Sequence, residues 1–150
     1  VVLGSGERRY EDRWRSLQAR FPERLAVRLG FDEGLAHRVE AGADFFVMPS
    51  LFEPCGLNQL YALRYGTVPI VRAVGGLKDT VVDLGRWGST GLSFADFSAA
   101  ALGAACERAW RLWADPANLR AVRRRGMARD FSWARSAARY EEVYAARKSA

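Results

Sequence analysis

One carboxylate stands in a predicted strand-to-helix turn, among neighbours that suit an anionic ligand. Glu53 follows the apolar run Phe45–Met48, which predicts a buried strand, and precedes Gly56–Tyr65, whose apolar spacing predicts a helix. The main-chain N–H groups from Cys55 to Asn58 then have no partner inside that helix, and with the positive end of its dipole they attract phosphate. A carboxylate accepts hydrogen bonds from sugar hydroxyls. This combination of groups suits a nucleotide sugar.

A simpler interpretation of Glu53 is that it only complements the dipole of the helix that follows, a surface effect of at most about 1 kcal/mol. Pro49 and Pro54 prevent regular structure in the connection, and Gly66 ends the helix. For a lone glutamate near a helix start, this local role is the more common one.

Two other loops carry residues that suit a nucleotide. Phe31 follows the predicted strand Leu25–Leu29, where its ring would stack on a nucleobase, although core packing fits the spacing equally well. Gly75 and Gly76 follow the predicted strand Val68–Arg72, and a glycine pair lets the backbone approach a ligand closely. An ordinary surface turn is the alternative for that pair.

Thiol chemistry and metal binding are not expected. Cys55 lies near a helix start, but His37, the single histidine of the chain, is expected on another helix in a structural or surface role. The only other cysteine, Cys106, is far away in sequence, and the two have no metal-like spacing. A disulfide framework is therefore not expected, and a reducing cytoplasm is the simplest location.

Composition indicates a globular domain with one core. The chain has 150 residues, of which 49% are hydrophobic, and no apolar run is long enough to span a bilayer. We expect no membrane partner. The formal charge of +6 raises the question of nucleic acid. A solvated helix face is the preferred interpretation of the basic cluster, which comprises Arg120, Arg123, Arg124, Arg125 and Arg129.

The order of predicted elements indicates an α/β fold. Strands and helices alternate as in a Rossmann-like parallel sheet flanked by helices, which binds ligands beyond the carboxyl ends of its strands. The predicted segments of this part are Val1–Gly4, Glu7–Arg20, Leu25–Leu29, Glu33–Ala41, Phe45–Met48, Gly56–Tyr65, Val68–Arg72 and Gly91–Phe94. The C-terminal third is expected to be helical, over Ala99–Trp113, Pro116–Arg125 and Ser132–Arg147.

The string from Phe52 to Pro69 resembles the signature of bacterial glycogen synthases and plant starch synthases, which are retaining glycosyltransferases of family 5 with the GT-B fold. The resemblance covers nearly the whole chain, through Gly30–Glu33, Ala36–Arg38, Val71–Arg72, Gly75–Leu77, Asp79–Val81 and Asp130–Trp133. It implies that residues 1–150 form a single, incomplete C-terminal nucleotide-sugar-binding domain. The acceptor-side domain, and the opening strand and helix of the donor-side domain, are then expected to precede residue 1.

The last predicted helix is amphipathic, with Ala137, Tyr140, Val143 and Tyr144 on one side. Core packing is the default expectation for such a face. In GT-B enzymes the last helix crosses back to the other domain, so the resemblance implies that part of this face is exposed in the present chain.

The resemblance also implies roles for the residues of the turn. Glu53 is expected to be catalytic, because its carboxylate would contact hydroxyls of the donor glucose and help to polarise the reacting end of the sugar. The N–H groups of Gly56, Leu57 and Asn58 are expected to meet the distal phosphate of the donor. Cys55 is expected beside the donor sugar.

Four more donor-binding positions follow from the resemblance. Phe31 stands where the family usually has a tyrosine against adenine. Tyr61 stands where related retaining transferases have a second glutamate, and it is expected to contact the ribose or to pack on the sheet. Gly75 and Gly76 are expected near the donor. An arginine and a lysine hold the donor diphosphate in the family, and both would precede residue 1.

Two residues depart from the family pattern. Leu51 replaces a common arginine, which removes a charge beside the site. Val74 replaces a common threonine, which removes a hydroxyl group.

The implied function is that of the donor-nucleotide domain of a glycogen or starch synthase. Such an enzyme transfers glucose from ADP-glucose to the non-reducing end of an α-1,4-glucan with retention, and needs neither a cofactor nor a metal. The expected partners are ADP-glucose or ADP and, through the missing domain, the glucan. The alternatives are a retaining transferase that uses another nucleotide sugar, and a non-catalytic nucleotide- or glucan-binding module. The chain alone is expected to be inactive.

Overall fold

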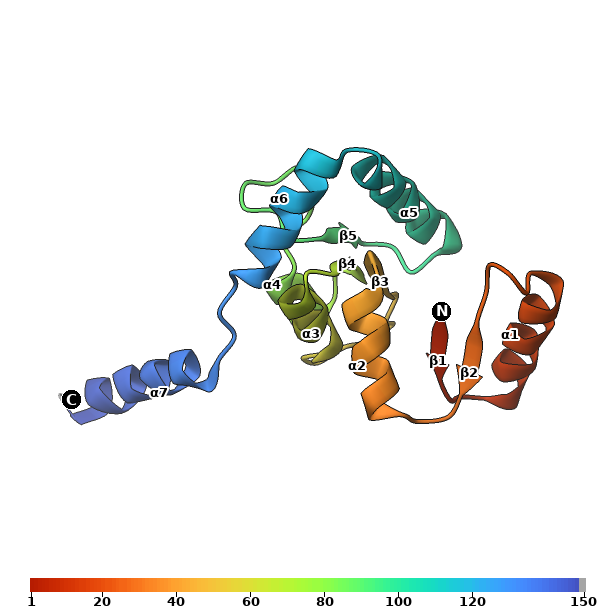
Figure 1. Ribbon diagram of the computed structural model, residues 1–150. Helices are drawn as coiled ribbons and strands as arrows, with labels where there is room; N and C mark the ends of the chain where they lie inside the picture. Colours follow the sequence, from red (N-terminus) through yellow and green to blue (C-terminus); the bar gives the residue numbers. More distant parts are fainter. Residues whose placement is uncertain (149–150) are drawn as a thin grey trace. The chain divides into compact units, whose positions relative to one another are not determined.

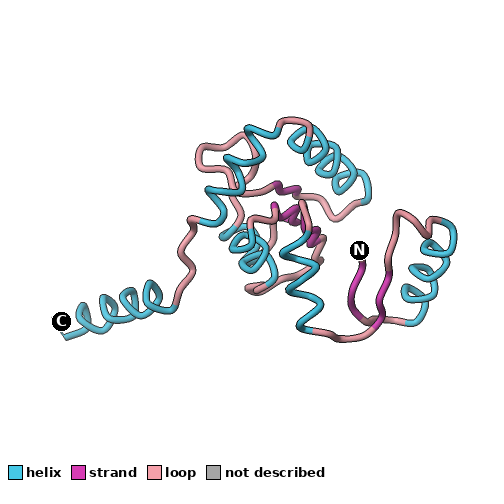
Figure 2. Tube along the Cα trace, in the orientation of Figure 1, coloured by secondary structure: helices cyan, strands magenta, loops and turns pink. Residues whose placement is uncertain are grey.

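The computed structural model describes residues 1–148 and divides the chain into two compact units. The first unit is Val1–Gly42, and the second begins at Ala43. The predicted α/β class is confirmed, because each unit contains a parallel sheet with helices beside it (Figure 2). No helix among residues 1–148 combines the length and the apolar character needed to cross a membrane.

The first unit is a strand–helix–strand–helix segment. Its elements are β1 (Val2–Gly4), α1 (Arg8–Arg20), β2 (Val27–Leu29) and α2 (Glu33–Gly42). The strands β1 and β2 are parallel, with Val2 opposite Val27. Asp32 caps α2, because its Oδ1 accepts a hydrogen bond from the N–H of Leu35 at 2.9 Å. Phe31 is thereby held at the turn between β2 and α2.

The second unit contains the remaining elements of the chain (Figure 1). They are β3 (Phe45–Met48), α3 (Asn58–Tyr65), β4 (Val68–Arg72), α4 (Gly75–Thr80), β5 (Leu92–Phe94), α5 (Ala99–Trp113), α6 (Pro116–Met127) and α7 (Trp133–Lys148). The sheet has the order β3-β4-β5 with all pairs parallel, and its register sets Phe45 opposite Val68 and Ile70 opposite Leu92.

The core of the second unit is built on both faces of the central strand β4. Val68 and Ile70 point to one face, where they pack against apolar residues of α5 and α6. Val71 points to the other face and packs with Met48 and with Leu77 of α4. Because both faces are covered, β4 is a continuous apolar run rather than an alternating one.

In the structure, α3 begins later in the sequence than predicted. The helix was expected from Gly56 but begins at Asn58, because Gly56 has a left-handed backbone with φ of 75°. The buried face of α3 also differs from the apolar spacing. It consists of Gln59, Ala62 and Leu63, whereas Leu57 is 56% exposed.

The glycine pair and the basic cluster also differ from their simplest interpretations. Gly75 and Gly76 open the short helix α4, so they are not an ordinary surface turn.

Within the basic cluster, Arg125 donates hydrogen bonds from Nε to the Ser89 carbonyl and from Nη2 to the Ser89 hydroxyl, at 2.7 and 2.9 Å. Arg123 forms an ion pair with Asp44. Part of this cluster therefore anchors α6 instead of facing solvent.

Core packing of the last helix was the wrong default. Tyr140, Val143 and Tyr144 of α7 are each more than 60% exposed. The entry to α7 is a local turn in which the N–H of Ser132 donates to Asp130 Oδ1 at 2.8 Å. This hydrogen bond holds the pKa of the Asp130 carboxyl below its ordinary value.

Candidate functional site

The candidate site is the loop of residues 49–57, which joins the carboxyl end of β3 to α3. In a parallel α/β sheet this is the edge at which ligands bind. The loop has no regular structure of its own, so its shape depends on contacts with neighbouring elements. Its main-chain carbonyl groups make most of those contacts.

Three carbonyl groups of the loop accept hydrogen bonds from residues of α3 and α4. The Glu53 carbonyl accepts from the N–H of Gly76 at 3.2 Å. The carbonyls of Cys55 and Gly56 both accept from the side-chain Nε2 of Gln59, at 3.0 and 2.9 Å. These bonds attach the loop at its middle and at its end.

The glycine pair is required by the close approach of α4 to this loop. A Cβ on Gly75 would lie 1.9 Å from the Glu53 carbonyl oxygen, and one on Gly76 would lie 2.2 Å from that of Cys55. Both distances are far below a van der Waals contact. The backbone that the glycines approach is therefore that of the Glu53 loop, and they act on the site by holding it.

Arg72 holds the start of the loop. From the end of β4, its Nη1 donates to the carbonyls of Ser50 and Leu51 at 3.3 and 2.8 Å, and its Nε donates to the carbonyl of Ala95 at 3.0 Å. Its guanidinium also lies over the ring of Phe97, 5.4 Å from the centroid. A cationic group is thus present beside Leu51, whose own side chain is apolar.

The Glu53 carboxylate is half-buried at the centre of the loop. The Ser50 hydroxyl donates to its Oε2 at a long 3.5 Å. This contact is weak, so the carboxylate keeps its capacity to accept hydrogen bonds from a ligand. Glu53, Cys55, Gly56, Gly75 and Gly76 are brought together in this one place.

The loop carbonyls determine where the neighbouring N–H groups point. In a planar trans peptide, the N–H is directed opposite to the C=O. The carbonyls of Cys55 and Gly56 face Gln59, so the N–H groups of Gly56 and Leu57 are turned away from it. They lie directly before α3, where the helix dipole favours negative charge. The arrangement is able to receive an anion.

The other predicted site residues are placed less tightly. Cys55 has an exposed, free thiol that donates only a weak hydrogen bond to the Gly56 carbonyl at 3.6 Å. Asn58 opens α3, and Tyr61 lies on the same helix with 38% of its surface exposed. Phe31 belongs to the first unit, and its side chain is 92% exposed. Core packing of Phe31 is therefore excluded, and a base-stacking role stays a prediction.

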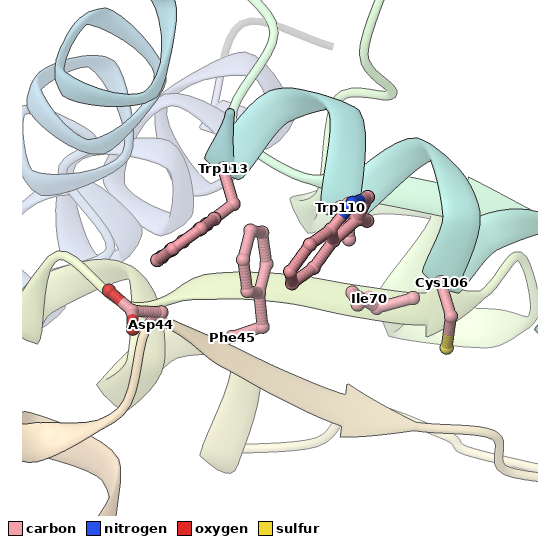
Figure 3. Close-up of a pocket in the computed structure, with 7 residues that line it drawn as sticks. Asp44, Phe45, Ile70, Cys106, Trp110 and Trp113 are labelled. Carbon is pink, nitrogen blue, oxygen red and sulfur yellow. The ribbon is translucent and has the colours of Figure 1, made fainter. Parts of the chain in front are cut away.

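One cavity of the second unit lies away from the Glu53 loop. It has a volume of about 330 Å³ and is apolar, with Trp110 and Trp113 projecting from α5 toward Phe45 (Figure 3). Phe45 is the first residue of β3, whereas the loop follows the last one. A smaller cavity of about 270 Å³ does lie near the start of the loop, between Pro49 and Phe97.

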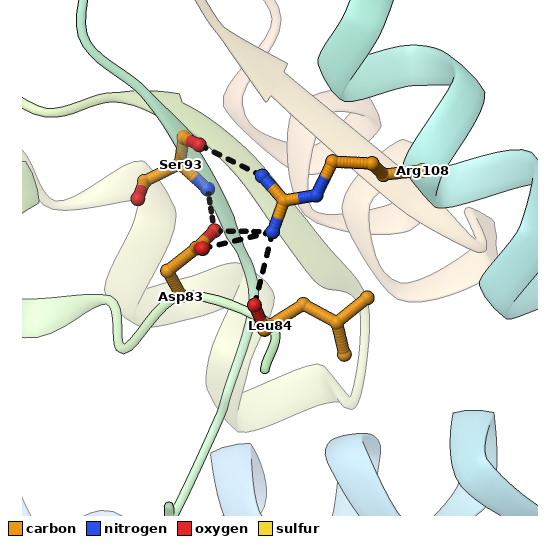
Figure 4. Close-up of polar contacts among 4 residues, drawn as sticks. All are labelled: Asp83, Leu84, Ser93 and Arg108. Atoms are coloured by element: carbon orange, nitrogen blue, oxygen red, sulfur yellow. Dashed lines mark hydrogen bonds and ion pairs between the residues drawn. The ribbon is translucent and has the colours of Figure 1, made fainter. Parts of the chain in front are cut away.

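A second polar cluster, around Arg108 of α5, is structural (Figure 4). Its Nη2 contacts both carboxylate oxygens of Asp83 at 2.9 and 2.8 Å, and donates to the Leu84 carbonyl at 3.0 Å. Its Nη1 donates to the Ser93 carbonyl at 3.2 Å. The cluster ties α5 to β5 and to the segment after α4. Across residues 1–148, no group of three or more His, Cys, Asp or Glu is arranged to hold a metal ion.

Sequence reasoning missed Arg72 and Gln59, the two side chains that bind loop carbonyls. It also missed Thr80, which contacts Gln59. One available signal was the helical spacing of Gln59, Ala62 and Leu63, which form the buried face of α3. Leu57 precedes the helix and does not belong to this face. A glutamine on a buried helix face needs hydrogen-bond partners, and the loop carbonyls supply them.

Comparison with known proteins gives three kinds of match. Residues 1–125 match the family described as glycosyl transferases group 1. The chain is 56% identical over 145 residues to the glycogen synthase of Anaeromyxobacter dehalogenans strain 2CP-C, covering 96% of this chain and 30% of that protein. It is 53% identical over 155 residues to the glycogen synthase of Aromatoleum aromaticum, covering 100% of this chain and 31% of that protein.

Among solved structures, the catalytic domain of starch synthase IV from Arabidopsis thaliana, bound to ADP and acarbose, matches with a TM-score of 0.83 and 34% identity. The match covers 98% of this chain and 31% of that one. A sucrose-phosphate synthase from Thermosynechococcus elongatus matches with a TM-score of 0.70 and 27% identity, covering 98% and 38%. The chain thus spans about 30% of the length of the curated relatives that it matches.

Proposed function

The chain belongs to the glycosyl transferases group 1 family, and from that premise we propose that it is the donor-nucleotide domain of a glycogen synthase. The complete protein would transfer glucose from ADP-glucose to the 4-hydroxyl at the non-reducing end of an α-1,4-glucan, with retention of configuration. High identity to proteins named glycogen synthase supports this proposal. So does the likeness to a starch synthase structure that holds ADP and acarbose.

The observation that carries the proposal is the shape of the Glu53 loop. Gln59 binds the carbonyls of Cys55 and Gly56, and Gly76 binds that of Glu53, so the N–H groups of Gly56 and Leu57 point away from Gln59. The Glu53 carboxylate has a long 3.5 Å contact with the Ser50 hydroxyl, which leaves it able to accept hydrogen bonds from a ligand. A nucleotide sugar offers matching groups, because its distal phosphate is anionic and its glucose carries hydroxyls that donate to a carboxylate.

In the proposed reaction, charge develops on the sugar and on the phosphate, and groups of this loop stabilise both charges. The bond between glucose C1 and the phosphate oxygen breaks, and its electron pair leaves with ADP. A new bond forms between C1 and the acceptor oxygen, whose proton passes to the phosphate oxygen just released. Positive charge develops on the sugar and negative charge on the phosphate. Glu53 stabilises the first and the N–H groups before α3 the second.

Within this proposal, the remaining predicted residues lie at or near the donor. Phe31 stacks on the base, Tyr61 contacts the ribose, and Gly75 and Gly76 hold the loop. The step uses neither a cofactor nor a metal. A cytoplasmic location agrees with the two free cysteines, Cys55 and Cys106. The glucan acceptor would be bound mainly by parts of the protein outside this chain.

The test is a donor comparison with the full-length protein. ADP-glucose, UDP-glucose and GDP-glucose are offered at equal concentration with a maltooligosaccharide, and the elongated product is analysed by NMR for α-1,4 linkage. We expect ADP-glucose to give the highest rate. Faster transfer from another donor would instead support the alternative of a different nucleotide sugar. Binding of ADP without transfer from any donor would support a non-catalytic module.

A further inference from the structure

We propose that Gln59 is a positioning residue that orients the N–H groups of Gly56 and Leu57 toward the distal phosphate of the donor. The inference rests on the proposed function and adds a residue to that site. Gln59 itself does not touch the donor in this account. It acts through the two carbonyl groups that it holds.

The side chain of Gln59 is completely buried, with 0% of its surface exposed. Its Nε2 is shared between the carbonyls of Cys55 and Gly56, at 3.0 and 2.9 Å, and reaches Thr80 Oγ1 at 3.3 Å. One amide group therefore fixes two consecutive peptide planes. Because each plane is rigid, fixing its carbonyl also fixes the N–H at its other side.

Thr80 connects the Cys55 and Gly56 peptides, through Gln59, to the backbone of Glu53. The Thr80 hydroxyl donates to the Gly76 carbonyl at 2.6 Å. The N–H of Gly76 in turn donates to the Glu53 carbonyl at 3.2 Å. Gln59 and Thr80 thus hold the proposed phosphate-binding amides and the backbone of Glu53 in one hydrogen-bonded frame.

The Gln59 amide has a cost in stability as well as a benefit. Its Oε1 is buried and finds no hydrogen-bond partner among the residues that the structure describes. A buried oxygen without a partner lowers stability. An apolar side chain of similar length would avoid that penalty but would remove the donor of the Cys55 and Gly56 carbonyls. What the amide adds is the Nε2 donor, and both main-chain acceptors of that donor belong to the loop.

The same amide leaves no room for a side chain at position 56. A Cβ on Gly56 would lie 2.4 Å from Gln59 Oε1. The left-handed φ of Gly56 separately disfavours other residues. A side chain at position 56 would therefore clash with the amide group that holds the two loop carbonyls.

The experiment measures ADP and AMP binding to the full-length protein by calorimetry, because the two ligands differ by the distal phosphate. Gln59→Met keeps the length of the side chain and removes the donor. We expect it to weaken ADP binding about tenfold, as for the loss of well-aligned bonds to a charged group. AMP binding should change by less than about twofold, so the ratio of the two affinities falls.

Thr67→Val is the matched control. The Thr67 hydroxyl also donates to a main-chain carbonyl, that of Ala43 at 3.0 Å, but at the opposite end of α3. This variant should lose stability and keep the wild-type ratio of ADP to AMP affinity. Equal weakening of ADP and AMP by Gln59→Met, or no change in either, would overturn the positioning role.

A second pair of variants covers the case in which Gln59→Met does not fold. Thr80→Val removes one contact of Gln59 and should lower the ratio of ADP to AMP affinity by a smaller factor, while Thr80→Ser keeps the hydroxyl and should restore it. An unchanged ratio in Thr80→Val overturns the frame described above. If the wild-type protein itself binds no ADP, the proposed function fails instead, so the two failures are distinguishable.

Discussion

Gly76 illustrates at the scale of one residue how closely the site is packed. Its Cα faces the Cys55 carbonyl oxygen, and an added methyl group would lie 2.2 Å from that atom. Neither partner is the flexible end of a side chain. Any substitution must therefore move the backbone of α4 or of the Glu53 loop.

We expect Gly76→Ala to destabilise the full-length protein by more than about 1 kcal/mol, as backbone clashes do, and to reduce transfer as well. Gly103→Ala is the control. Gly103 lies inside α5 with nothing within 4 Å of an added Cβ, so alanine should raise stability by about 0.5–1 kcal/mol. The melting temperatures of the two variants check this prediction, because Gly76→Ala should melt below the wild type and Gly103→Ala above it. A wild-type melting temperature in Gly76→Ala would contradict the close approach.

At the scale of elements, most of the fold was predictable from local pattern. The strands Phe45–Met48 and Val68–Arg72 and the helix Ala99–Trp113 have the predicted bounds. The start of α3 was not predictable from apolar spacing, because the left-handed Gly56 delays it. The buried face of α3 was also missed, since it includes a glutamine, Gln59, whose partners are the main-chain carbonyls of Cys55 and Gly56 rather than apolar side chains.

The chemical groups of the candidate site were predictable from the sequence, whereas the residues that hold its loop in place were not. Glu53 and the amides before α3 are local in sequence, so a strand-to-helix pattern identifies them. Arg72 contacts the loop, and Thr80 contacts Gln59, in each case across 21 positions of sequence. Contacts of that kind depend on how the elements pack, and sequence periodicity carries no record of them.

The Arg108 cluster gives a prediction about elements, because it joins α5 to β5 and to the segment after α4. Arg108→Met should cost about 1–2 kcal/mol of stability, a partly exposed charge-assisted network being worth less than a buried one. Arg111→Met is the control one turn away on α5. Arg111 and Glu107 form a pair at 3.9 Å whose side chains are 78% and 74% exposed, which predicts almost no effect. Equal losses of melting temperature in the two variants would contradict the role of the cluster.

At the scale of the whole molecule, the chain has the composition of a domain but spans about 30% of its curated relatives. Its last described helix, α7, leaves large apolar side chains exposed, with Trp133 at 85% and Tyr144 at 64%. Large apolar side chains exposed along one helix are typical of a surface that another part of a protein covers.

This leads to a prediction for residues 1–150 alone. The purified 150-residue chain should produce no glucan from ADP-glucose, because the acceptor side and the diphosphate-binding residues implied by the family resemblance lie outside it. The full-length protein under identical conditions is the control. Incorporation of labelled glucose into a maltooligosaccharide measures both. Turnover by the short chain would show that it contains a complete site.

The most direct test of the account is the transfer rate of Glu53→Gln in the full-length protein, measured together with ADP binding. The account predicts that kcat falls at least about 100-fold, since a group that stabilises charge in the transition state is removed. ADP affinity should stay within about threefold, because the loop amides remain, and the exposed Glu107→Gln on α5 should behave as the wild type. A Glu53→Gln enzyme that transfers glucose at the wild-type rate would contradict the assignment of this loop as the donor-sugar site.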